Sequence, residues 1–290
     1  MRFKVALVLL LSLFLVVLMP SQCSREREKN NVILKQTNYL VYYNEINSGN
    51  LNKISQYDMA IIEPANVTSE QLSEIKESDT LTYGYQSIFE VENYNTEKIK
   101  LLNEDDYLYL DGVKQFNEKY QCFYGDIRSS NYRNVLLTSI EKNVIEKGFD
   151  GVFFDTLDDI EHLIDERFRE ELYIEYIEFF QLLKRKYPKL SIIQNRAFDL
   201  YGLGSAKYLD GLMFEDMEHE KILTSEYYIN LVERLTKTAH DNKVVILAIA
   251  HHDALENYEL AKNLNWLYYF TTPSNNYLKF EKSSYKIILK

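Results

Sequence analysis

Short apolar runs recur along this chain and alternate with segments of helical period. The runs are apolar without a polar alternation, which is typical of strands in a parallel sheet that is covered on both faces. They span residues 39–43, 58–62, 80–85, 150–154, 191–194, 210–214, 244–249 and 266–270. The clearest helical spacing lies at residues 69–77, 132–147, 163–187, 225–241 and 254–263. This alternation predicts an α/β protein.

Eight strands alternating with helices favour a single (β/α)8 TIM barrel over an open doubly wound sheet. No linker or repeat divides the chain after residue 30, so we expect one domain over residues 38–290. Nothing reads as a GxGxxG or GxxxxGK[ST] phosphate loop. The least regular part, residues 86–131, predicts an extended loop over the barrel mouth after the third strand.

The N-terminus has the pattern of an export signal. Arg2 and Lys4 precede a mostly apolar stretch over residues 5–19, which is shorter than a membrane span. We expect a signal peptide or a lipoprotein signal over residues 1–22, followed by a short tether over residues 23–37. The predicted location is extracellular or in the cell envelope. Membrane contact is expected only through a lipid on Cys23 or an uncleaved signal.

Polar side chains follow five of the predicted strands. Glu63, Tyr85, Asp155, Asn195 and Glu215 stand where the second to sixth strands end. In a (β/α)8 barrel the carboxyl ends of all strands meet at one mouth, where active sites lie. We therefore expect these five side chains to share one site.

Two of the five are acids from alternate strands, Asp155 and Glu215. Strands in a sheet lie about 4.8 Å apart, so the two carboxyl groups are expected within roughly 5 to 9 Å of each other. Paired acids at this distance suit glycoside hydrolysis, in which one acid protonates the leaving oxygen and the other attacks or activates water. The alternative is that both are ordinary acids at loop entries, with Asp155 capping the next helix.

Other chemistries have weaker support. The acids from Asp155 to Glu161 lack the spacing of a calcium loop, and His251-His252 has no HExxH pattern, so no metal site is predicted. No GxSxG motif supports a serine nucleophile, and two-carboxylate chemistry needs no cofactor. The formal net charge of −11 disfavours nucleic acid as a partner.

Four ordered motifs resemble the endo-α-1,4-polygalactosaminidase-like glycoside hydrolases of family 114, which have a TIM-barrel fold. Residues 85–94 are similar to the family's YxSIGExExY, with Phe89 in place of the usual Gly. Residues 148–158 look like GFDGVxLDxxD, residues 195–197 like NxG, and residues 210–215 like DGxxxE. Asp126 is similar to an aspartate that precedes the fourth strand. The seventh strand departs from the family by ending in His251-His252.

The resemblance implies a glycosidase that cleaves an α-1,4-linked amino-sugar polysaccharide, such as a cationic polygalactosamine-like polymer. It implies Asp155 and Glu215 as the catalytic acids. Around the sugar it implies the substrate-binding residues Glu63, Tyr85, Glu90, Asp126 and Asn195, and the acid cluster adds Asp158. Three alternatives remain open: a glycosidase for a different polysaccharide, a carbohydrate-binding barrel without catalysis, and a structural envelope protein.

Overall fold

The computed structural model describes residues 31–274 and 277–280. The predicted signal segment and Cys23 lie outside these residues. The described part of the predicted tether packs on the barrel, because Ile33 is fully buried and the Asn31 amide donates to the backbone oxygens of Asp210 and Lys243, each at 2.7 Å. No helix of the described part of the chain is long and apolar enough to cross a membrane.

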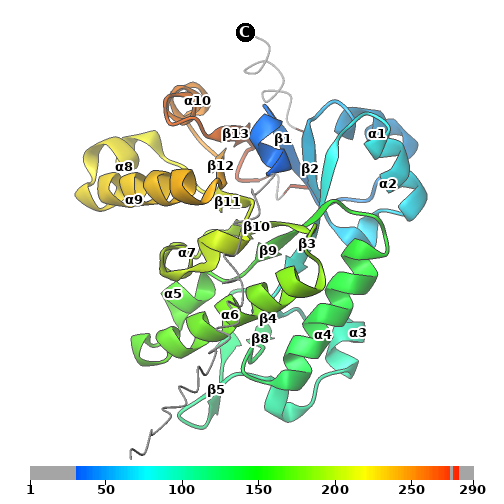
Figure 1. Ribbon diagram of the computed structural model, residues 1–290, viewed down its shortest axis with the longest axis vertical. Coiled ribbons are helices and arrows are strands. Elements are labelled where there is room, and N and C mark those ends of the chain that lie inside the picture. The colour runs from blue at the N-terminus through cyan, green and yellow to red at the C-terminus, as the bar shows by residue number, and fades with distance from the viewer. Residues whose placement is uncertain (1–30, 275–276, 281–290) are drawn as a thin grey trace, which may run out of the picture. The chain divides into compact units, whose positions relative to one another are not determined.

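Eight parallel strands form one sheet that curls into a nearly closed barrel, as predicted (Figure 1). In spatial order the strands are β1 (Tyr39–Tyr42), β2 (Met59–Ile62), β3 (Leu81–Ser87), β9 (Gly151–Asp155), β10 (Ser191–Asn195), β11 (Gly211–Phe214), β12 (Val245–Ala250) and β13 (Leu267–Phe270). The first and last of these lie side by side, and the rings of Tyr39 and Tyr269 meet there at 5.7 Å.

Helices surround the sheet. They are α1 (Ser48–Ile54), α2 (Ser69–Lys76), α4 (Ser130–Ile140), α5 (Asp159–Leu163), α6 (Glu166–Lys186), α7 (Phe198–Leu203), α8 (His219–Thr224), α9 (Glu226–Asn242) and α10 (Ala254–Asn263). The Thr68 hydroxyl caps α2 in a reciprocal pair with Gln71. After Ile140, α4 continues as one π-helical segment, Glu141–Ile145. The predicted helices are therefore present, with boundaries shifted by a few residues.

The alternation of side chains along β9 determines where its last residue points. Phe154 faces outward, because its ring stacks on Phe180 of α6 at 5.4 Å. Phe153 faces the opposite way, toward Tyr85 of β3 at 6.3 Å. Successive side chains of a strand alternate between faces, so Asp155 lies on the same side as Phe153, toward the barrel axis.

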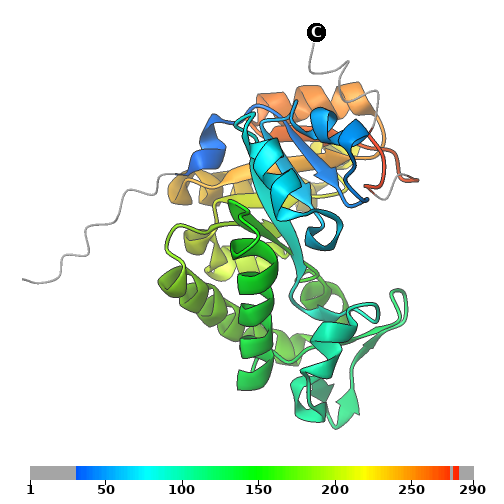
Figure 2. The same cartoon turned by 90° about the vertical axis from the view of Figure 1, so that its right-hand side faces the viewer.

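The segment predicted as an extended loop, residues 86–131, instead folds into a small lobe. It contains β4 (Glu90–Val91), α3 (Thr96–Lys100), β5 (Tyr109–Leu110), β6 (Val113–Lys114), β7 (Phe116–Asn117) and β8 (Cys122–Tyr124). β4, β8 and β7 form an antiparallel sheet, and β5 pairs with β6. The lobe lies at one end of the molecule beside α4 (Figures 1 and 2).

Phe89 occupies the position where the family motif has glycine. Its ring is fully buried, stacks on Tyr124 at 4.4 Å and meets the edge of Tyr176 at 6.3 Å. Phe89 is not among the residues with positive φ in the described part of the chain. The substitution therefore requires no glycine conformation and adds an aromatic contact between the lobe and α6.

Candidate active site

One asparagine joins the two acids at the mouth of the barrel. Asp155 ends β9, Asn195 ends the neighbouring β10, and Glu215 follows β11 directly. The Asn195 Nδ2 group donates to Asp155 Oδ1 and to Glu215 Oε2, each at 2.9 Å. Because both oxygens lie 2.9 Å from one nitrogen, they are at most twice that distance, about 5.8 Å, from each other.

Burial raises the pKa of the Asp155 carboxyl above its ordinary value, and the charge of Asp158 adds to the increase. The hydrogen bond from the Asn195 amide opposes the increase, and the backbone of Thr156 and the side chain of Tyr85 lower the pKa further. Hydrogen bonds to the charged form favour that form. Asp155 is thus a half-buried carboxylate that accepts a hydrogen bond from Asn195.

Burial also raises the pKa of Glu215, and here the charge of Asp155 contributes next to burial. Two donors oppose the shift, the Asn195 amide and the Tyr277 hydroxyl, which donates to Glu215 Oε1. Glu215 therefore accepts two hydrogen bonds and has Asp155 as a negative neighbour that favours its protonated form.

A tyrosine cluster forms the wall beside the two acids. The ring of Tyr43 meets Tyr85 edge-on at 5.1 Å and Tyr277 at 5.4 Å. The backbone N–H of Tyr43 also donates to the carbonyl of Tyr277 at 2.8 Å. Tyr43 follows β1 directly, and its hydroxyl pKa is raised by burial and by Asp155 and Glu215. Flat rings with polar tips suit the faces of sugars.

Glu63 lies on the same side of the mouth. Its Oε1 accepts from the backbone N–H of Ala65 at 3.1 Å, which caps a short 3-10 helix after β2. Burial raises its pKa, and the charge of Glu92 contributes. The hydroxyl of Tyr94 lies 3.5 Å from Glu92 Oε1, and its pKa is raised by burial and then by the charges of Glu92, Glu63 and Asp155.

A second row of charges lies next to the pair. Arg196 Nε is 3.3 Å from Asp158 Oδ2, and Arg196 NH1 is 3.4 Å from Asp216 Oδ2. Asp216 Oδ1 in turn is 3.1 Å from His251 Nε2, while His251 Nδ1 lies 3.2 Å from the carbonyl oxygen of Thr271. Burial raises the pKa of Asp158 to about 6. His251, with an acceptor at each nitrogen, has a raised pKa because of Asp216.

Glu90 is inside the lobe and faces away from the pair. Its Oε1 accepts from Asn117 Nδ2 at 2.6 Å, and the same amide lies 3.2 Å from Asp159 Oδ2. Burial raises the pKa of Glu90 to about 8, and the charge of Asp159 and a hydrogen bond to it contribute. The buried thiol of Cys122 is a further neighbour. These contacts give Glu90 a structural environment.

Asp126 is also turned away from the pair. Arg128 donates to it through Nε at 2.9 Å and through NH2 at 2.8 Å, and Arg128 NH1 continues to Glu171 at 2.8 Å. The carboxylate is thus occupied by a bidentate ion pair on the side of α4 and α6. The structure brings Glu63, Tyr85, Asp158 and Asn195 to the acids, but not Glu90 or Asp126.

Two residues of this site escaped sequence reasoning, Tyr43 and Tyr277. Tyr43 follows its strand as directly as Glu215 does, so the rule that selected the other strand ends applies to it as well. Tyr277 lies in the loop after the last strand, where no periodic signal places it. Among the described residues, no group of three or more His, Cys, Asp or Glu side chains could hold a metal ion.

Comparison with known proteins identifies the family to which this chain belongs. The model of glycoside hydrolase family GH114 matches residues 29–247. The chain belongs to glycoside hydrolase family 114. It is therefore a glycoside hydrolase, and the matched residues contain the barrel from β1 into β12 together with both acids.

Solved structures share the fold of this family 114 member. The glycoside hydrolase domain of PelA from Pseudomonas aeruginosa is 19% identical with a TM-score of 0.69, over 84% of this chain and 97% of that one. Ega3 from Aspergillus fumigatus, solved in complex with galactosamine, is 16% identical with a TM-score of 0.61, over 84% and 94%. An α-galactosidase from Thermus thermophilus is 14% identical with a TM-score of 0.56, over 87% and 61%. No curated protein matches the sequence.

Proposed function

We propose that this glycoside hydrolase cleaves an α-1,4-linked amino-sugar polysaccharide, polygalactosamine-like in character, with Asp155 and Glu215 as its two catalytic acids. The observation that carries the proposal is the single Asn195 amide that donates to both carboxylates at 2.9 Å. Two half-buried acids thus lie side by side at the carboxyl ends of barrel strands, where active sites lie in such folds.

The separation of the acids supports a retaining mechanism. Retaining glycosidases hold their carboxyl groups about 5 to 5.5 Å apart, whereas inverting enzymes leave about 6.5 to 9.5 Å for a water molecule. The two bridged oxygens are at most about 5.8 Å apart, which is compatible with the shorter, retaining separation.

In this mechanism the ionised Asp155 attacks the anomeric carbon while Glu215 protonates the leaving oxygen. The attack forms an ester between the sugar and Asp155. Glu215, now ionised, then takes a proton from the water that hydrolyses this ester. The hydrogen bonds at each acid support these roles. The Asn195 amide stabilises the charge on Asp155, and that charge favours the protonated form of Glu215.

An amino sugar suits the charges beside the pair. Glu63 and Asp158 add carboxylates near the reacting centre, and the tyrosine wall of Tyr43 and Tyr85 offers ring faces to an ammonium or a pyranose. Ega3, which shares the fold, was solved with galactosamine bound. A polymer of cationic sugars would meet complementary charge here.

Hydrolysis of deacetylated galactosamine polymer, followed as new reducing ends, tests the proposal against neutral α-glycans. Glu215→Gln and Asp155→Asn preserve size and remove the acids, so we expect kcat to fall by about 10² to 10⁴-fold in each. Asp241→Asn, an exposed acid on α9, is the matched control.

Each outcome separates the alternatives. Turnover of neutral glycans alone would show that the proposed substrate is wrong, while the proposed two-carboxylate mechanism would still stand. Binding of polymer by the wild type without any turnover would instead identify a carbohydrate-binding barrel. If no glycan is bound at all, the alternative that remains is a structural envelope protein. The anomeric configuration of the first product, observed by NMR, tests retention.

We also infer that the protein is exported. Arg2, Lys4 and the apolar residues 5–19 have the order of a signal segment. Cell fractionation of the wild type and of Cys23→Ala tests this. Lipid anchoring predicts that the variant leaves the membrane fraction, simple secretion predicts both proteins in the medium, and retention of both in the cytoplasm contradicts export.

A further inference from the structure

Thr156, the residue after Asp155, has an unusual backbone conformation. Its φ is +73°, in the left-handed region that glycine and asparagine tolerate and that β-branched residues avoid. Such strain persists only where surrounding contacts compensate for it, and it is concentrated at functional sites. The contacts of the Thr156 side chain are therefore informative.

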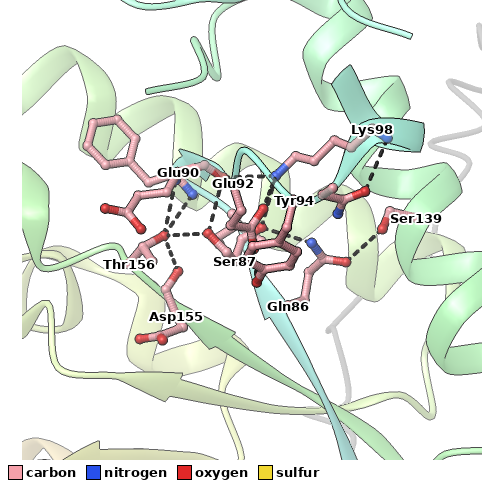
Figure 3. A network of polar contacts seen from close by, with 12 residues as sticks. Gln86, Ser87, Glu90, Glu92, Tyr94, Lys98, Ser139, Asp155 and Thr156 are labelled. Atoms are coloured by element: carbon pink, nitrogen blue, oxygen red, sulfur yellow. Dashed lines mark hydrogen bonds and ion pairs between the residues drawn. The ribbon is translucent and has the colours of Figure 1, made fainter. Parts of the chain in front are cut away.

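The Thr156 hydroxyl is at the centre of a polar network (Figure 3). It accepts from the backbone N–H groups of Phe89 at 3.1 Å and Glu90 at 3.2 Å. It donates to the carbonyl of Asp155 at 2.6 Å and lies 3.0 Å from the Ser87 hydroxyl. One side chain thus ties the turn after β3 to the end of β9.

This hydroxyl uses its full hydrogen-bonding capacity. A threonine hydroxyl has one hydrogen to donate and two lone pairs. The two lone pairs receive the N–H groups of Phe89 and Glu90, residues that are buried. Valine at this position would leave both N–H groups without a partner, and glycine would relieve the backbone but supply no oxygen. Only a hydroxyl close to the main chain meets both requirements.

The same residue contacts the backbone of Asp155. The Thr156 hydroxyl donates to the Asp155 carbonyl, which also receives the N–H of Ile88 at 3.3 Å. The backbone amide of Thr156 also lowers the pKa of the Asp155 carboxyl. Thr156 therefore fixes the backbone from which the Asp155 side chain extends toward Asn195.

We propose that Thr156 is a positioning residue for the glycosidase reaction, whose hydroxyl locks the turn after β3 to the end of β9 and so aims Asp155 at Asn195 and Glu215. This inference rests on the proposed role of Asp155. It adds a residue that touches no substrate and acts through the orientation of the acid.

The turn after β3 has a second anchor, which keeps a Thr156 variant folded. Lys98 of α3 is buried, and its ammonium donates to the carbonyls of Glu90 at 2.9 Å and Ser87 at 3.3 Å. It also lies 3.5 Å from the carboxylate of Glu92. Loss of the Thr156 hydroxyl therefore loosens one side of the turn and leaves the other attached.

The test compares Thr156→Ser, which keeps the hydroxyl, with Thr156→Gly, which removes it and relieves the φ of +73°. A misplacement of about 1 Å can cost about 10²-fold in rate, so we expect kcat of the glycine variant to fall by about that factor while KM changes little. The serine variant should stay within a few-fold of the wild type. Thr138→Val, which removes an exposed hydroxyl that donates to Asn134 on α4, is the matched control.

The pH dependence separates positioning from general damage. Reorientation of Asp155 away from its donors displaces the acidic limb of the kcat/KM profile, whereas a smaller folded fraction lowers the rate at every pH alike. The proposal would be overturned if Thr156→Gly had the same kcat and the same pH profile as the wild type. It would also be overturned by a serine variant as slow as the glycine variant at equal melting temperature.

A readout without turnover distinguishes this inference from the proposed function. Titration of the Asp155 carboxyl carbon, followed by NMR on protein with labelled aspartate, should show a displaced midpoint in Thr156→Gly and none in Thr138→Val. An unchanged midpoint overturns the positioning role. If the wild type is inactive but the midpoint is displaced in Thr156→Gly, the proposed function is refuted and the positioning role of Thr156 is not.

Discussion

Replacement of Asn195 by alanine removes an amide that donates to both acids. Its Nδ2 donates to Asp155 and Glu215 at 2.9 Å, and the residue is 4% exposed. Asp155 loses its hydrogen bond from Asn195, whereas Glu215 keeps the one from the Tyr277 hydroxyl. The two carboxyl groups would then face each other across a small buried space.

The size of the effect follows from the two lost hydrogen bonds. A hydrogen bond to a charged group contributes about 1.5 to 3 kcal/mol. One pKa unit corresponds to about 1.4 kcal/mol, so the pKa of each carboxyl should rise by roughly 1 to 2 units. The sign is upward for both, because the lost donor favoured the ionised form. Water entering the space left by Asn195 would replace part of the loss and favours the lower end.

The assay is the initial rate on deacetylated galactosamine polymer as a function of pH. In Asn195→Ala the acidic limb of kcat/KM should move up by about 1 to 2 units, since Asp155 must be ionised to attack. The plateau rate should fall by about 10 to 10²-fold, which is the kinetic equivalent of about 1.4 to 2.7 kcal/mol. Asn143→Ala, which removes an amide that donates to Ser139 outside the mouth, is the control.

A plateau rate and an acidic limb that both match the wild type would refute the role assigned to the amide. A reduced plateau with an unmoved limb would show that Asn195 binds the sugar without tuning the acids. Melting curves of Asn195→Ala and Asn143→Ala establish that equal fractions of the two variants are folded.

The pKa of Glu90 is raised from its ordinary 4.5 to about 8. Between these pH values the folded protein holds a proton that the unfolded chain has released. The free energy of unfolding should therefore decrease as the pH rises from about 4.5 to about 8. Urea titrations at pH 5 and pH 8 should show this decrease in the wild type. The decrease should be smaller in Glu90→Gln, whose neutral side chain carries no charge to repel Asp159. An equal change in the free energy of unfolding between the two pH values in both proteins would contradict the prediction. A Cβ on Gly151 would lie 2.6 Å from the backbone oxygen of Ser191, so Gly151→Ala should lower stability by about 1 to 3 kcal/mol. Gly202→Ala, with open space around it, should not, and equal melting temperatures for the two variants would show that β9 and β10 can separate freely.

The barrel was predictable because its strands are buried on both faces. β1, β2, β11 and β12 are buried at every position, and this produces the unbroken apolar runs that distinguish a parallel sheet. The lobe was not predictable in the same way. Most of its strands have only two residues, too few for any period, and their pairing depends on contacts distant in sequence.

The site was predictable as far as strand ends define it. Asp155, Asn195 and Glu215 were found because parallel strands deliver their last residues to one mouth. Tyr277 was missed because its position depends on the path of a loop, which follows from its contact with Glu215 and the backbone of Tyr43.

The charges at the mouth show why a count of acids is a poor guide to the substrate. The sequence places Asp126 and Glu90 among the sugar-binding acids, yet Arg128 neutralises the first, and burial keeps the second protonated below about pH 8. Neither carboxyl offers a free negative charge to a cationic polymer. Complementarity with an ammonium group therefore depends on Glu63, which lies beside the pair, and not on the net charge of the chain, because Asp158 is itself paired with Arg196. Neutralisation of Glu63 is the change that should weaken the binding of an amino sugar.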